Sequence, residues 1–206
     1  MRWRNSPEQW GAVARAFHWA IALFIIANIP LGLWADALPL SPTKVEAFYW
    51  HKSIGLTVLW LALLRLLWRA ANPTPRLPAI MPRWERMLAH ASHALLYSAM
   101  IAMPLSGWVI HSASGFPLDL YGVISVPDIV PGNLDDGAVE DGAATVHYWI
   151  FILICVLLTL HLAGAFKHHF IDRDEVLRRM LPFARASTRA DTPNRSVTRA
   201  PDEGKR

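Results

Sequence analysis

The stretch GAATVHYWIFILICVLLTLHLAGAF, residues 142–166, contains no Asp, Glu, Lys or Arg. An α-helix needs about 20 mainly apolar residues to cross the hydrocarbon core of a bilayer, and this stretch exceeds that length. The segment between Arg86 and Asp119 is equally free of charge, and two earlier segments are almost as apolar. We therefore predict an all-α integral membrane protein, a four-helix bundle with spans at about residues 16–35, 49–68, 88–111 and 144–166.

Composition excludes several other classes of protein. Hydrophobic residues make up 53% of the chain and charged residues only 17%, which is atypical of a soluble enzyme. Cys155 is the single cysteine, so no intramolecular disulfide and no cysteine pair for a metal is expected. No small-residue cleavage site follows the first apolar segment, so we expect that segment to remain as a span. Membrane lipid is the expected surroundings, with no nucleic-acid partner.

The basic residues predict the orientation of the chain. The spans assign 18 of the 20 Lys and Arg residues to one side, and only Lys44 and Lys52 to the other. Because Lys and Arg near helix ends are retained in the cytoplasm, both termini are predicted to be cytoplasmic. Residues 1–182 form the predicted membrane domain, and residues 183–206, which are basic and nearly free of large apolar side chains, form a predicted disordered cytoplasmic tail.

Histidines within the spans are the candidates for chemistry, because ionisable side chains in a bilayer are costly. His147 follows Asp141 by six residues, and His161 precedes Lys167 by six. They are 14 residues apart, about 21 Å along a helix and roughly 40° apart around its axis. The two rings are therefore expected at opposite membrane faces and on one side of the helix.

Each of these histidines has a predicted partner at its own depth. His18 begins the first span on the cytoplasmic side and can meet His161, whereas His51 begins the second span on the outer side and can meet His147. Two neutral imidazoles from different helices suit the two axial positions of a haem iron, whereas zinc usually takes four ligands. The pattern predicts two b-type haems and electron transfer between the membrane faces. The alternative is that the histidines only hydrogen-bond to neighbouring groups.

Three further histidines have predicted roles outside these pairs. His90 and His93 lie on one helix face at the cytoplasmic start of the third span and can compete with His18 for the cytoplasmic haem. Interfacial hydrogen bonding is the preferred role for both. His111, at the outer end of the same span, is expected to contact lipid headgroups.

Basic side chains near the four histidines are candidates for contacts with the haem propionates. Arg15 and Arg65 lie at the predicted depth of the cytoplasmic pair, and Lys52 lies beside the outer pair. Extension of each side chain to the lipid headgroups is an equally good interpretation.

Several motifs resemble the bacterial cytochrome b561 family. The similarity extends over residues 13–182 and is carried by RAFHW in the first span, HKSIG and RLLWR at the two ends of the second, LAHASHALLY and MPLSGW in the third, and HLAGAFKHHFIDRDEVLRRMLP at the end. The resemblance implies a dihaem protein of the bacterial inner membrane that exchanges electrons with the quinone pool.

The resemblance also implies roles for particular residues. Family ligands come from the first, second and fourth spans, which here corresponds to His18, His51, His147 and His161. One branch of the family is a superoxide oxidase that passes electrons from superoxide to ubiquinone, and His168 falls where the quinone would bind. The alternative function is a cytochrome b subunit that relays electrons between quinol and a separate redox protein, and a third hypothesis is a haem-free scaffold or transporter.

Overall fold

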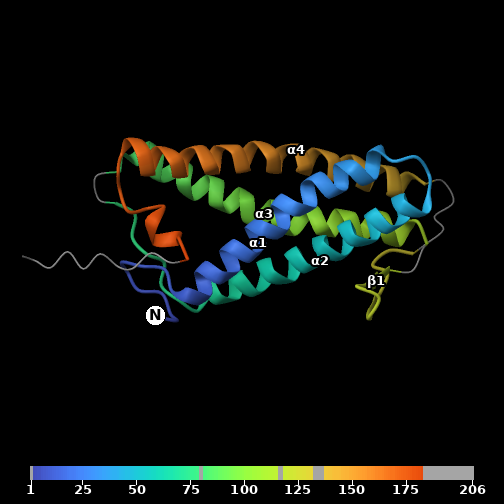
Figure 1. Ribbon diagram of the computed structural model, residues 1–206, viewed down its shortest axis with the longest axis horizontal. Helices are drawn as coiled ribbons and strands as arrows, with labels where there is room; N and C mark the ends of the chain where they lie inside the picture. The colour runs from blue at the N-terminus through green and yellow to red at the C-terminus, as the bar shows by residue number, and fades with distance from the viewer. Residues whose placement is uncertain (1, 79–80, 116–117, 132–136, 183–206) are drawn as a thin grey trace, which may run out of the picture.

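The chain forms a bundle of four long helices (Figure 1). The computed structural model describes residues 2–78, 81–115, 118–131 and 137–182. The helices are α1 (Ala12–Ala37), α2 (Pro42–Ala70), α3 (Arg83–Ala113) and α4 (Ala138–Phe166), and each is longer than the apolar segment it contains. The predicted all-α four-helix bundle is therefore confirmed. The predicted tail, residues 183–206, lies outside the described residues.

All four helices are long and apolar enough to cross a membrane. Packing follows chain order: α1 lies along α2, α2 along α3 and α3 along α4. Small clusters of buried side chains join them, among them Ile21, Ala62 and Met100. Many large apolar side chains instead face outward, such as Trp149 at 63% and Leu160 at 53% exposure. An outer surface of this kind suits lipid rather than water, so the chain is a multi-pass membrane protein.

The connection between α1 and α2 is short, and hydrogen bonds cap both helix ends. The Ser41 hydroxyl accepts a hydrogen bond from the Lys44 backbone N–H at 3.3 Å, and Pro42 occupies the first helical position. The Lys44 ammonium donates to the carbonyl oxygens of Asp36 and Leu38 at 3.0 and 2.8 Å. Lys44 therefore neutralises the carbonyl end of α1.

The long loop between α3 and α4 contains a short hairpin. Strands β1 (Leu118–Leu120) and β2 (Ile124–Val126) pair antiparallel. Leu118 is buried against α2, and the Tyr121 hydroxyl lies 2.8 Å from Thr57 Oγ1. The hairpin therefore packs against the middle of α2, around Leu56 and Thr57.

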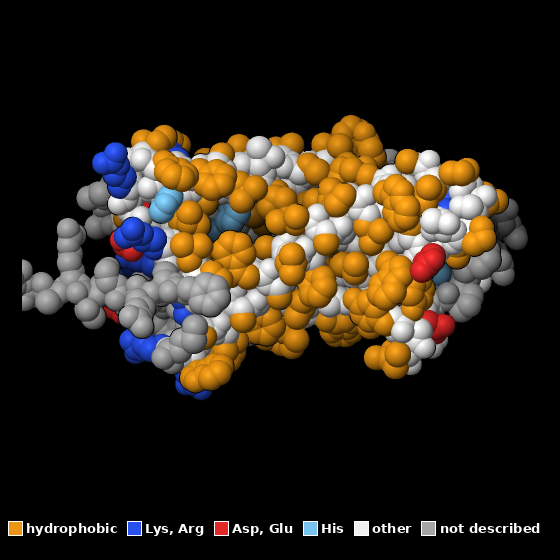
Figure 2. Space-filling view, viewed as in Figure 1, with side chains coloured by type: hydrophobic (Ala, Val, Ile, Leu, Met, Phe, Trp, Pro, Cys, Tyr) orange, Lys and Arg blue, Asp and Glu red, His pale blue; other side chains and the backbone are white. Residues whose placement is uncertain are grey.

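The N-terminal segment, the connection between α2 and α3 and the segment after α4 meet at one end of the bundle (Figure 1). The Arg76 N–H donates to the Pro7 carbonyl at 2.8 Å, and Arg15 Nη1 donates to the Leu181 carbonyl at 2.9 Å. Figure 2 shows Lys and Arg side chains gathered at this end. We call it the basic end, and we call the opposite end, which carries Asp36 and the hairpin, the acidic end.

After Phe166 the chain leaves the bundle through irregular turns at the basic end. A π-helical turn, η1 (Lys167–Ile171), continues α4 directly, and a single 3₁₀ turn, η2 (Arg178–Met180), follows. The π turn changes the direction in which its side chains point relative to a continuing α-helix.

Candidate functional site

At the acidic end, His51 of α2 faces His147 of α4, with ring centroids 6.4 Å apart. His51 Nδ1 lies 3.2 Å from the Asn28 carbonyl oxygen, and His147 Nδ1 lies 2.9 Å from Ser106 Oγ. The Ser106 hydroxyl donates its own proton to the Met103 carbonyl at 2.8 Å, so it accepts from the imidazole. Both rings therefore carry their proton on Nδ1, and Nε2 is the nitrogen left to bind a metal.

Glycines lie directly against these two rings. A Cβ at Gly32 of α1 would lie 2.5 Å from His51 Cε1, and one at Gly107 of α3 would lie 3.3 Å from His147 Cε1. A small cavity of about 40 Å³, which Lys52 also lines, lies between the two histidines. Because these glycines have no side chain, each imidazole has room beside the neighbouring helix. We call His51 and His147 the acidic-end pair.

At the basic end, three histidines gather rather than two. His18 of α1 and His161 of α4 have ring centroids 6.2 Å apart, and His93 of α3 lies 5.6 Å from His161. The preference for an interfacial role is therefore wrong for His93, because its ring packs on His161 inside the bundle. His90, one turn away, is exposed. We call His18, His93 and His161 the basic-end cluster.

Arginines from α2 border this cluster. Arg65 Nη1 lies 3.0 Å from His18 Nδ1, and the guanidinium groups of Arg65 and Arg69 lie 5.4 and 5.7 Å from the Tyr97 ring centroid. Since a guanidinium only donates, His18 Nδ1 accepts and its proton resides on Nε2 in this arrangement. Arg65 must therefore turn to another acceptor, such as a propionate, before His18 Nε2 can bind iron.

The other predicted basic contacts have specific partners. Arg15 Nη1 donates to the Leu181 carbonyl, and the side chain lines a groove beside α1. A contact between Arg15 and a haem propionate stays a prediction. Lys52 Nζ lies 3.0 Å from His111 Nδ1. His111 is only 4% exposed, so the expected headgroup contact is wrong: the imidazole is held inside the bundle, where it partners Lys52.

His168 lies at the basic end, outside the cluster. Its Nδ1 lies 2.7 Å from Asp174 Oδ2 and 3.2 Å from Asp172 Oδ2. It follows His161 by seven residues along the chain, beyond the end of α4 and within the π turn η1. His168 therefore lies at the same end of the bundle as the basic-end cluster without being part of it.

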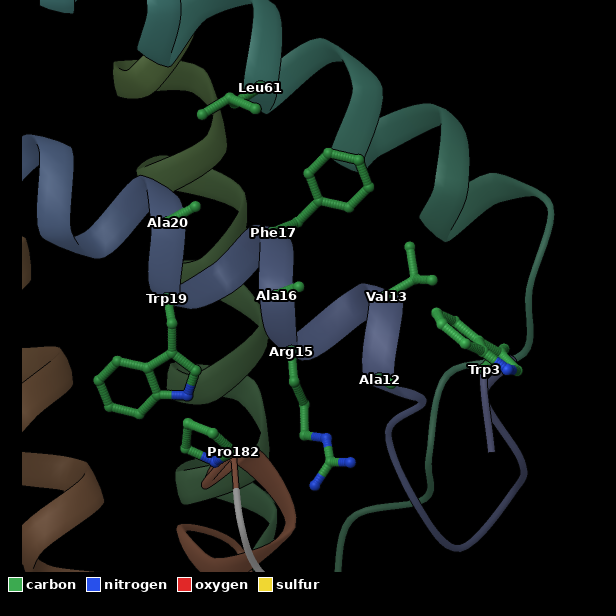
Figure 3. Close-up of a pocket in the computed structure, with 10 residues that line it drawn as sticks. All are labelled: Trp3, Ala12, Val13, Arg15, Ala16, Phe17, Trp19, Ala20, Leu61 and Pro182. Atoms are coloured by element: carbon green, nitrogen blue, oxygen red, sulfur yellow. The ribbon is translucent and has the colours of Figure 1, made fainter. Parts of the chain in front are cut away.

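An apolar groove of about 600 Å³ also lies at the basic end (Figure 3). Phe17, Ala20 and Trp19 of α1 line it together with Trp3 and Pro182, and Figure 3 shows the Arg15 side chain at its border. Trp19 Nε1 donates to the Met180 carbonyl at 2.7 Å and so connects α1 to η2. The groove is suited to an apolar chain.

The ring separations at both ends suit a haem iron held by two imidazoles, and at the basic end the Arg65–His18 contact must open first. A metal–imidazole bond is about 2 Å, and a ring nitrogen lies roughly 1 Å from the ring centre, so two rings on opposite sides of one iron have centroids about 6 Å apart. The two pairs, at 6.4 and 6.2 Å, have this separation. At the acidic end the hydrogen bonds also leave Nε2 for the metal, which is the usual arrangement of a ligating histidine.

Sequence reasoning missed the supporting residues. Asn28 acts through its backbone carbonyl, which no side-chain pattern reveals, whereas Ser106 lies in the quoted MPLSGW motif without an assigned role. Arg69 and Tyr97 follow Arg65 and His93 by four residues. This spacing of one turn places each pair on one helix face, so it could have indicated that Arg69 and Tyr97 lie beside Arg65 and His93.

Comparison with known proteins identifies relatives over nearly the whole chain. The sequence model of the prokaryotic cytochrome b561 family matches residues 9–183. The chain is 36% identical over 187 residues to cytochrome b561 homolog 2 of Escherichia coli (strain K12), covering 88% of this chain and 95% of that protein. It is 27% identical to the "Probable superoxide oxidase CybB" of Yersinia pestis, covering 85% of this chain and 97% of that one. A similar match, 26% identical over 80% of this chain and 92% of the relative, is cytochrome b561 homolog 1 of Escherichia coli (strain K12). The chain therefore belongs to the prokaryotic cytochrome b561 family and is a membrane cytochrome of the b-haem type.

Proposed function

We propose that this protein transfers electrons across the membrane through two b-type haems, one bound by His51 and His147 and the other by His18 and His161. The observation that carries the proposal is the separation of the two ring pairs, 6.4 and 6.2 Å, at opposite ends of one bundle. Both pairs include a histidine of α4, and these two are 14 residues apart, or about 21 Å.

The chain's own residues determine what chemistry is available. When bound, the haem irons would supply one-electron oxidation and reduction, with His51 and His147 holding one haem and His18 and His161 the other. Asn28 and Ser106 orient the acidic-end rings through Nδ1. Arg65, Arg15 and Lys52 are the proposed partners of the propionate groups, with Arg69 a further cation beside Tyr97.

We assign the basic end to the cytoplasm of a bacterium and the acidic end to the outer face of its inner membrane. This assignment rests on the distribution of Lys and Arg, which gather at the basic end (Figure 2). The described parts of both terminal segments lie there, as the bond between Arg15 and Leu181 illustrates. Both termini are accordingly proposed to be cytoplasmic.

Ubiquinone is the proposed electron acceptor, bound near His168 at the basic end. His168 follows the cluster residue His161 by seven residues, and the apolar groove beside α1 at the same end is large enough to accept part of an isoprenoid tail. Reduction to ubiquinol consumes two electrons, delivered across the membrane, and two protons, taken from the cytoplasmic side.

Superoxide is the proposed electron donor at the acidic end, on the basis of similarity to the Yersinia pestis relative. Two superoxide anions give up one electron each and leave as two molecules of oxygen. This supplies the two electrons that one ubiquinone needs, and the reaction is balanced.

A second candidate donor is a separate redox protein, with electrons relayed to or from quinol. The observation that favours it concerns the two basic residues of the acidic end. Lys44 is bound to backbone carbonyls, and Lys52 is turned to His111, so neither ammonium points freely outward to attract an anion. Acidic residues such as Asp36 and Glu46 are exposed there and slow the approach of an anion.

Purified protein in vesicles that contain ubiquinone separates the two donors. Enzymatically generated superoxide is expected to reduce the haem and form ubiquinol, and superoxide dismutase should abolish both. His168→Ala should slow ubiquinol formation while haem reduction persists. If superoxide leaves the haem oxidised although dithionite and a quinol reduce it, the superoxide proposal is wrong and the relay remains.

A further inference from the structure

The turn after α4 holds a histidine and carboxylates in a defined arrangement. His168 is the second residue of the π turn η1, and its side chain is only 15% exposed. The last two residues of the turn, Phe170 and Ile171, are instead exposed. The π turn thus directs His168 inward while the chain leaves the bundle.

Asp174 is the carboxylate most firmly bound to this histidine. The Nδ1–H of His168 donates to Asp174 Oδ2 at 2.7 Å, and the Asp174 side chain is also 15% exposed. Asp174 Oδ1 accepts from the Val176 N–H at 2.9 Å, and the Asp174 N–H donates to the His168 carbonyl at 3.0 Å. Both carboxylate oxygens and the backbone are therefore fixed around the ring.

The other charged groups near His168 are two carboxylates that share one ammonium. Lys167 Nζ bridges Asp172 Oδ2 at 2.7 Å and Glu85 Oε1 at 2.9 Å, which joins η1 to α3. Asp172 also lies 3.2 Å from His168 Nδ1, but its nearer partner is the ammonium. Ligand atoms of Glu85, His168 and Asp172 are close enough together for a metal ion, yet the ammonium already bridges both carboxylates.

We propose that Asp174 is a positioning residue for proton delivery by His168 to the bound quinone, an inference that rests on the proposed function. By holding the proton on Nδ1, the carboxylate presents Nε2 to the quinone oxygen and stabilises the imidazolium that donates from it. Each of the two electrons that reach the quinone is matched by one proton from His168 Nε2. The ring then recovers a proton from cytoplasmic water, so that quinone, two electrons and two protons give quinol.

The test compares an acceptor that needs protons with one that does not. Haem in the full-length holoprotein is reduced with dithionite, and its reoxidation is followed with a short-chain ubiquinone and with ferricyanide, which takes an electron without a proton. Asp174→Asn is expected to lower kcat for the quinone by about 100-fold, the lower bound of what general acid catalysis typically contributes. KM for the quinone, the rate with ferricyanide and the haem spectrum should be unchanged.

Two variants serve as matched controls. Glu175→Gln removes the same charge from the neighbouring residue, which is 43% exposed and paired with Arg178 at 3.3 Å, and should leave both rates unchanged. Asp174→Glu keeps a carboxylate and should recover much of the quinone rate. It also provides a folded variant if Asp174→Asn is unstable.

The outcomes distinguish this inference from the proposed function. A normal quinone rate in Asp174→Asn, with a slow rate in His168→Ala, overturns the role of Asp174 and leaves the quinone site intact. Normal quinone rates in both variants overturn the site at His168 and the inference together. Equal slowing of ferricyanide and quinone in Asp174→Asn would also contradict the inference, because the defect would then not involve a proton.

Discussion

The acidic-end pair and the basic-end cluster contain the same imidazole chemistry in different surroundings. At the acidic end, His51 and His147 each donate from Nδ1 to an oxygen, and a glycine of the adjacent helix lies against each ring. At the basic end, His18 instead accepts from Arg65, and a third imidazole, that of His93, packs on His161.

The different surroundings of the two sites suit two different tasks. A site that only relays electrons needs ligands in a fixed orientation, which two Nδ1 hydrogen bonds and close glycines provide. Under the proposed function the basic-end site lies next to a reacting quinone, which needs cations and exchangeable protons as well. Arg65, Arg69 and the imidazole of His93 supply these around the basic-end cluster, and His168 lies beyond it.

The largest expected effect concerns which histidines of the basic-end cluster bind iron. His18→Ala is expected to lose one haem of two, because His161 then lacks its proposed partner, whereas His93→Ala should retain both. Haem-to-protein ratios and reduced-minus-oxidised spectra of the two purified variants measure this directly. Loss of a haem in His93→Ala with retention in His18→Ala would assign the site to His93 and His161 instead.

A smaller effect is expected from filling the space beside a ligand at the acidic end. A Cβ at Gly32 would lie 2.5 Å from His51 Cε1, so Gly32→Ala must displace the ring. We expect haem affinity at this end to fall toward 100-fold, the upper range for a disturbed ligand orientation. Gly164→Ala is the control, since a Cβ at Gly164 has no neighbour within 4 Å. Equal haem retention in the two variants would show that the close approach of Gly32 is irrelevant.

The smallest expected effect concerns the hydrogen bond to His147. Ser106→Ala removes the oxygen that accepts from His147 Nδ1 at 2.9 Å and leaves the ring itself in place. Loss of a hydrogen-bond partner of a ligating histidine lowers metal affinity by about 10- to 100-fold, and we expect a value near 10-fold here. Redox titration and haem release should reveal a change in one haem only. A change in both haems would mean that Ser106 acts on the whole bundle.

The four-helix bundle and the pairing of the four proposed ligands could both be predicted from the sequence. Long uncharged stretches specify spans regardless of tertiary contacts, and the depth of a residue in a span follows from counting residues to the nearest charge. His18 and His161, like His51 and His147, were paired by depth alone, and the structure places their rings together.

Rotation about the helix axis was harder to predict than depth. His93 and His111 were assigned to the membrane interface because they lie near span ends, yet their helix face turns both inward. The role of the Asn28 carbonyl depends on the packing of α1 against α2, which no residue pattern encodes. The short hairpin between α3 and α4 was hidden in a loop rich in Gly, Pro and Asp.

The number of haems per chain tests the account most directly. Full-length protein purified in detergent is assayed for haem and for protein, and its reduced-minus-oxidised spectrum is compared with those of His147→Ala and His161→Ala. The account predicts two b-type haems in the unaltered chain and one in each variant, with a different haem lost each time. A single haem in the unaltered chain, or loss of the same haem in both variants, would contradict it.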